Sequence, residues 1–211
     1  MTVRVLYLCE GPSDMGLRFH IEEIAAEMGA RILVTAPDLN RLPNKPGHSV
    51  ADKLRAAQQL SNAGQEYDLV VIHRDSDGGP PDDRRREIAE AVAAVSPGLA
   101  HVPAIPVRML EAWLLLNEAA IREVAGNPNG KVALKLPKPA RVESAADPKA
   151  LLKQAIATAS EDRGRSLQKL QARFPENRAR LLQMLDREGP VKQLTSWQSF
   201  THDLREALGS P

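Results

Sequence analysis

The sequence has very little cysteine and no excess of either charge. Cys9 is the only cysteine in 211 residues, so the chain cannot form an internal disulfide or a cysteine-rich zinc site. Lysine and arginine number 28 and aspartate and glutamate number 27, which gives a formal net charge of +1. The charge of the whole molecule therefore favours neither an anionic nor a cationic partner, and any such preference must come from a local cluster.

Long apolar runs are also missing. No run approaches the ~18 residues of a membrane-spanning helix, and the chain begins in a strand pattern without the apolar segment of a signal peptide. We therefore expect a cytoplasmic protein without a membrane partner. There is no internal repeat, and apolar residues make up 43% of the chain, which is enough for an ordinary core.

Short apolar runs typical of strands alternate with helical spacing along the first part of the chain. Strands are predicted over 3–9, 31–35, 68–73 and 101–107, and helices over 14–28, 50–64, around 88–95 and over 109–117. This alternation predicts an α/β fold with a mostly parallel sheet flanked by helices. Two prolines, Pro103 and Pro106, indicate that the fourth strand lies at an edge of the sheet or ends irregularly.

The chain becomes loop-like after residue 125 and then helical. Further helices are predicted over 147–159, 165–174 and 176–187, with a last helix around Trp197. We therefore predict an α/β domain over residues 1–125 and a helical extension over 126–211, which could pack on the first domain as one unit.

Two predicted strands end in acidic residues. Asp75 and Asp77 follow the third strand and precede two glycines, and Glu10 follows the first strand. Their i, i+2 spacing would place Asp75 and Asp77 on one side of an extended backbone. Because the carboxyl ends of parallel strands meet at one edge of the sheet, we expect these acids to share a site.

Two more acids are candidates for the same site. Glu111 is the one charged residue of an apolar helix, so its carboxylate needs a partner; an internal ion pair with Arg74 or Arg108 is the alternative. Asp14 is predicted first as a helix cap and second as a metal ligand. Asp75 and Asp77 could also be ordinary turn residues.

Carboxylates without a cluster of histidine or cysteine favour a hard cation with oxygen ligands. The predicted cofactor is Mg²⁺ or Mn²⁺, and its candidate ligands are the acids at the strand ends, Glu10, Asp14, Asp75, Asp77 and Glu111. Such an ion usually binds phosphate as well, and two of them can activate water and stabilise the leaving oxygen of a phosphodiester.

The acidic motifs resemble those of a known fold. Glu10-Gly11-x-x-Asp14 after one strand and Asp75-x-Asp77 after a later one look like the signature of the Toprim fold, which topoisomerases, bacterial primases and OLD-type nucleases share. Residues 106–115 are similar to a segment of small bacterial Toprim-like proteins that are often associated with defence or mobile genes. The resemblance covers about residues 1–120.

The resemblance implies a metal site of Glu10, Asp75 and Asp77, with Glu10 as general base or acid and Glu111 as an additional acid. Neither tyrosine has a setting that suits a topoisomerase, and one cysteine cannot supply the zinc module of a primase. The expected activity is metal-dependent hydrolysis of DNA or RNA, with Glu10, Asp75, Asp77 and Glu111 as catalytic residues. OLD proteins carry an ATPase module that this chain lacks, so the resemblance implies a separate ATPase partner if activity needs one.

Local clusters of basic residues are the candidate contacts to nucleic acid. Residues 131–153 hold six basic and two acidic residues, and Arg84-Arg85-Arg86 begins a predicted helix. We predict phosphate contacts from Lys135, Lys138, Arg84 and Arg85, although solvated helix faces explain the same charges.

Two other functions fit the acids. A phosphohydrolase of the haloacid-dehalogenase type would use Asp75 as its nucleophile, but it would leave Glu10 without a role. A non-catalytic Toprim-like scaffold or sensor would keep the acids and work with a partner protein. The affinity for a divalent cation separates a scaffold from a nuclease. The sequence predicts no particular oligomeric state.

Overall fold

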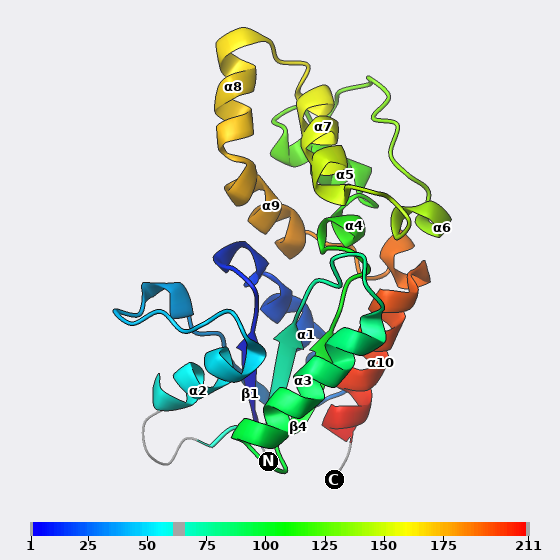
Figure 1. Ribbon diagram of the computed structural model, residues 1–211. Coiled ribbons are helices and arrows are strands. Elements are labelled where there is room, and N and C mark those ends of the chain that lie inside the picture. Colours follow the sequence, from blue (N-terminus) through cyan, green and yellow to red (C-terminus); the bar gives the residue numbers. More distant parts are fainter. Residues whose placement is uncertain (1, 61–65, 210–211) are drawn as a thin grey trace.

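The computed structural model describes residues 2–60 and 66–209, and its centre is one four-stranded sheet (Figure 1). The strands are β1 (Val3–Leu8), β2 (Ile32–Thr35), β3 (Leu69–His73) and β4 (Ala100–Ala104). All are parallel, in the order β2-β1-β3-β4, which confirms the predicted α/β class. The edge position of β4 agrees with Pro103 and Pro106, and the strand ends before the second proline.

Helices cover both faces of the sheet. They are α1 (Leu17–Glu27) and α10 (Thr195–Gly209) on one face, and α2 (Val50–Leu60) and α3 (Pro81–Val95) on the other. Alternate residues of β1 point to opposite faces of the sheet: Val5 and Tyr7 pack towards α1, whereas Leu6 and Leu8 pack towards α2. Burial on both sides explains why the strands are almost continuously apolar. The predicted end of the second helix, near Gly64, lies outside the described residues.

The remaining helices lie mainly beyond the carboxyl ends of the strands (Figure 1). They are α4 (Glu111–Leu114), α5 (Glu118–Val124), α6 (Pro139–Val142), α7 (Pro148–Ser160), α8 (Gly164–Ala172) and α9 (Phe174–Gln183), with 3-10 helices η1 (Pro12–Asp14), η2 (Leu39–Arg41) and η3 (Pro190–Gln193). The single helix predicted over 109–117 is wrong. Asn117 accepts a hydrogen bond from the Ala120 amide at 3.0 Å and so caps a new helix, α5.

An aromatic cluster joins this helical region to the sheet. Trp113 of α4 packs against Trp197 and Phe200 of α10, with 5.0 Å between the two tryptophan ring centroids, and its Nε1 donates to Ser196 Oγ at 2.8 Å. Since α10 also lies on β4, one apolar core continues across residue 125. No helix in the described part of the chain is both long and apolar enough to cross a membrane.

Candidate functional site

The strand order creates a switch point between β1 and β3. The chain leaves β1 for β2 on one side and later returns to place β3 on the other, and crevices form at such points beyond the strand ends. Glu10 follows β1 there and Asp75 follows β3. The Asp75 amide donates to Glu10 Oε1 at 3.2 Å, so the first and third strands bring these two acids into direct contact.

All five candidate acids line one open cavity. Its volume is about 460 Å³, and the acids on its wall are Glu10, Asp14, Asp75, Asp77 and Glu111. The helical region supplies the opposite wall with Lys149, Phe174 and Arg178. The cavity therefore lies between the carboxyl edge of the sheet and residues that follow the predicted boundary.

Arg178 of α9 binds two of these acids. Its Nε donates to Glu111 Oε1 at 2.8 Å, and its Nη1 donates to Ser13 Oγ at 2.8 Å and to the Asp14 carboxylate. Burial alone would lower the pKa of Arg178, but the charges of Asp14 and Glu111 outweigh it and raise this pKa. Arg178 is therefore a fixed cation inside the site.

The predicted partners of Glu111 are wrong. Arg74 lies 3.5 Å from carboxylate oxygens of Glu10 and Glu87, and Arg108 donates to a backbone carbonyl at 3.4 Å. Arg178 pairs with Glu111 instead, 67 residues away in the sequence. The apolar surroundings of Glu111 in the sequence predicted that it needs a partner. The identity of that partner depends on how α9 packs against the rest of the fold.

Asp14 also differs from its predicted role as a cap of α1. That helix begins at Leu17, with Gly16 in the cap position. The Asp14 carboxylate accepts from the Gly11 amide at 2.9 Å, and its backbone oxygen accepts from the Tyr7 hydroxyl at 3.0 Å. Asp14 therefore closes the turn after β1.

His73 lies buried between two of the acids. Its Nε2 is 3.2 Å from Asp75 Oδ1 and its Nδ1 is 3.9 Å from Asp14 Oδ2. Burial lowers the pKa of His73, but the hydrogen bond to Asp75 and the charge of Asp14 overcome this and raise it. Burial acts in the opposite direction on a carboxyl group and raises the pKa of Asp14. The positive charges of His73 and Arg178 outweigh it, so the pKa of Asp14 is lowered. The folded protein therefore binds a proton on His73 more tightly than an unfolded chain would.

Asp77 departs from the strand geometry that the i, i+2 spacing suggested. It has φ of 54° and precedes Gly78 with φ of 84°, so the chain turns away instead of extending. Its carboxylate is 64% exposed and accepts from Arg84 Nη2 at 2.9 Å. Arg84 also donates through Nε to the Asp75 backbone oxygen at 3.1 Å. Asp77 still lines the same cavity as Asp75, but through a turn.

The carboxylate oxygens of the site suit a hard cation, but the side chains are not arranged around a common metal position. Within residues 2–60 and 66–209, no three side chains of histidine, cysteine, aspartate or glutamate are grouped as a metal site requires. Arginines pair with four of the five acids, Glu10, Asp14, Asp77 and Glu111. Glu10 and Asp75 are adjacent oxygen donors, and oxygen is what Mg²⁺ and Mn²⁺ prefer.

The predicted phosphate contacts occupy different places. Lys135 and Lys138 are exposed and do not line the acidic cavity. Arg85 pairs with Asp203 of α10 at 2.8 Å. Arg84 alone reaches the site, where it binds Asp77. Of the predicted basic contacts, only Arg84 touches the acids.

Sequence reasoning missed other cations. Lys149 and Arg178 line the cavity, and a basic stripe of Arg165, Lys169 and Arg173 follows α8 and its C-cap up to the cavity residue Phe174. The spacing of four residues that puts this stripe on one helix face is visible in the sequence. Phe174, the residue after Arg173, lines the cavity itself, so the stripe ends at the wall of the site.

Comparisons with protein-family models, curated proteins and solved structures found no match.

Proposed function

We propose that the protein is a Mg²⁺- or Mn²⁺-dependent nuclease of the Toprim type. The observation that carries this proposal is the set of five acids around one open cavity at the switch point of a parallel sheet. Acids in this position, with oxygen donors and no cluster of soft ligands, suit an ion that binds phosphate.

Glu10, Asp75 and Asp77 are the residues that would hold the cation. When bound, the cation supplies an activated water and neutralises charge on the phosphate. The protein's own contribution is orientation: the Leu110 amide donates to Asp75 Oδ1 at 3.0 Å, and the Asp75 amide holds Glu10. On the opposite wall, Lys149 offers a positive charge to a phosphate that enters the cavity.

The basic stripe on α8 supports nucleic acid as the substrate. This helix contributes no buried residue, and within the described part of the chain the side chains of Arg165, Lys169 and Arg173 have no hydrogen-bond or ionic partner. Unpaired cations on one face attract a phosphate backbone independently of sequence. A strand bound along α8 would pass from Arg173 to Phe174 and so reach the acids.

A nuclease assay with plasmid, single-stranded DNA and RNA tests this function. The wild-type protein should cleave at least one of them with Mg²⁺ or Mn²⁺ and not with EDTA, and Asp75→Asn should abolish cleavage. Asp82→Asn is the matched control, because Asp82 is an exposed acid in the first turn of α3 and does not line the cavity. Equal cleavage by wild type and Asp75→Asn would reject the assigned site.

A non-catalytic scaffold is the second candidate, and the pairing of the acids favours it. Arg178 holds Asp14 and Glu111, so two of the five carboxylates already have a permanent counter-charge. Calorimetric titration with Mn²⁺ separates the two functions: a nuclease requires binding that Asp75→Asn weakens, whereas a scaffold does not. The nuclease assay is repeated with a candidate ATPase partner, because nuclease activity that depends on a second chain would otherwise be missed.

A further inference from the structure

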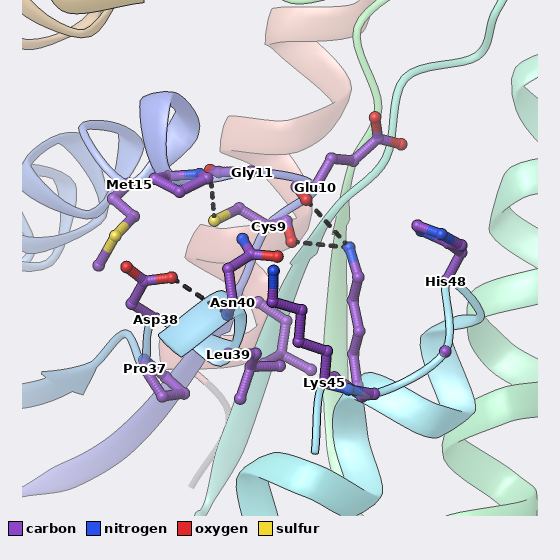
Figure 2. Close-up of a pocket in the computed structure, with 15 residues that line it drawn as sticks. Cys9, Glu10, Gly11, Met15, Pro37, Asp38, Leu39, Asn40, Lys45 and His48 are labelled. Atoms are coloured by element: carbon purple, nitrogen blue, oxygen red, sulfur yellow. Dashed lines mark hydrogen bonds between the residues drawn. The ribbon is translucent and has the colours of Figure 1, made fainter. Parts of the chain in front are cut away.

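A second cavity lies on the other side of Glu10. It has a volume of about 200 Å³ and is formed by the loop after β1, the segment 37–48 and the first turns of α2 (Figure 2). Glu10 and Gly11 line both this cavity and the acidic one. The two cavities therefore share a wall.

Two lysines supply the second cavity with cationic hydrogen-bond donors. Lys45 points into it beside Asn40 in Figure 2, and within residues 2–60 and 66–209 its ammonium has no hydrogen-bond or ionic partner. Lys53 of α2 donates to the backbone oxygens of Cys9 at 3.1 Å and Glu10 at 3.2 Å. An ammonium has three donors, so Lys53 retains one beyond these two bonds.

The two acids that line this cavity have arginine partners of their own, and only the charge of Glu10 also acts on Lys53. Asp38 pairs with Arg41 at 3.0 Å, and Glu10 pairs with Arg74 at 3.5 Å. Both arginines lie outside the cavity lining. Neither acid of the lining forms an ion pair with Lys45 or Lys53 among the described residues, so both ammonium groups can accept an anion as partner.

Local hydrogen bonds and prolines restrict the segment that carries Lys45. The Asp38 carboxylate accepts from the Asn40 amide at 3.2 Å and begins η2, and Arg74 reaches the His48 backbone oxygen at 3.5 Å. Pro43 and Pro46 restrict the backbone on either side of Lys45. A cation on a restrained loop loses less freedom when it binds an anion.

We propose that this second cavity is a phosphate-binding site, in which Lys45 and Lys53 bind the phosphate and the side-chain amide of Asn40 supplies a further hydrogen bond. The phosphate can belong to a free mononucleotide or to a nucleic acid strand whose neighbouring phosphodiester lies at the acids. The second source rests on the proposed function, and the first does not.

Isothermal titration in EDTA tests the proposal with three probes: inorganic phosphate, adenosine 5′-monophosphate and a 5′-phosphorylated oligonucleotide. Lys45→Gln should weaken binding roughly ten-fold, as expected for one charge-assisted hydrogen bond, and Lys45→Arg should retain it. Lys192→Gln is the matched control, because this exposed lysine of η3 lines a different cavity. Lys45 is exposed, so its substitution leaves the core intact.

The outcomes distinguish the two sources. Binding of phosphate or the mononucleotide that depends on Lys45 supports a free ligand, and dependence seen with the oligonucleotide alone supports a strand phosphate. Absence of binding for every probe, or equal binding by wild type and Lys45→Gln, overturns the proposal. Asp75→Asn should bind inorganic phosphate as the wild type does. Phosphate binding at the second cavity is therefore tested independently of the proposed nuclease activity.

Discussion

Replacement of Arg178 by methionine should cost the protein a large part of its stability. Methionine keeps most of the apolar stem but removes the guanidinium that binds Glu111, Asp14 and Ser13. The Glu111 side chain is 3% exposed, so its carboxylate would lose its counter-charge where little water compensates for the loss. Breaking a buried pair in this way costs about 3–5 kcal/mol, because it leaves an uncompensated charge behind.

The measurement is urea unfolding at neutral pH, followed by circular dichroism. Arg180→Met is the matched control: it lies two residues further along α9, and its ion pair with Glu123 is 57% and 48% exposed. Such a surface pair contributes about 0–1 kcal/mol. A loss for Arg178→Met no larger than that for Arg180→Met would refute the assignment of a buried, energetically coupled pair.

A double substitution separates the orphaned charge from the lost packing. In Arg178→Met with Glu111→Gln, the buried amide carries no charge, so part of the stability should return relative to Arg178→Met alone. If the two changes were simply additive, the cost of Arg178→Met would come from packing and not from the ion pair.

Three further results are expected. His73→Gln should flatten the dependence of the unfolding free energy on pH. The raised pKa of His73 contributes stability that is fully present below the ordinary value of 6.5 and is lost as the pH rises through the pKa of the folded protein. If urea unfolding showed the same slope of stability against pH in the variant as in the wild type, this reasoning would be contradicted. Ser196→Ala should cost about 1–3 kcal/mol in urea unfolding, since the buried Trp113 indole loses its acceptor. Arg85→Gln should leave DNA affinity unchanged in fluorescence anisotropy, whereas Arg173→Gln should weaken binding and reduce its salt dependence; equal effects would remove the α8 stripe from the interface.

The sheet could be predicted from the sequence because its signals are local. Each strand is a short apolar run followed by a helical pattern, and these two features alone require parallel strands covered on both faces. The break before α5 was also encoded locally, because Asn117 is a strong cap, but the apolar residues around it have helical spacing on both sides. Periodicity identified the buried face there and missed the boundary.

The site could be predicted only in part. Glu10 and Asp75 meet because both follow neighbouring parallel strands, which is a consequence of topology. The period-two argument failed for Asp77, because the strand ends at His73 and Gly78 permits the left-handed turn that follows. The role of Arg178 has no local signal, since it depends on the docking of α9 against η1.

The strengths of the arginine pairs determine which acids a cation could recruit. Asp77 and Arg84 form an exposed pair worth about 0–1 kcal/mol, so a divalent ion can displace this arginine at little cost. Glu111 is held in a buried pair whose disruption costs about 3–5 kcal/mol, which an ion with several retained waters repays poorly. Glu10 is part-exposed and its pair with Arg74 is longer, at 3.5 Å. Of the five acids around the cavity, Glu10, Asp75 and Asp77 are therefore the ones that the proposed cation could recruit, while Arg178 keeps Asp14 and Glu111 as part of the fold.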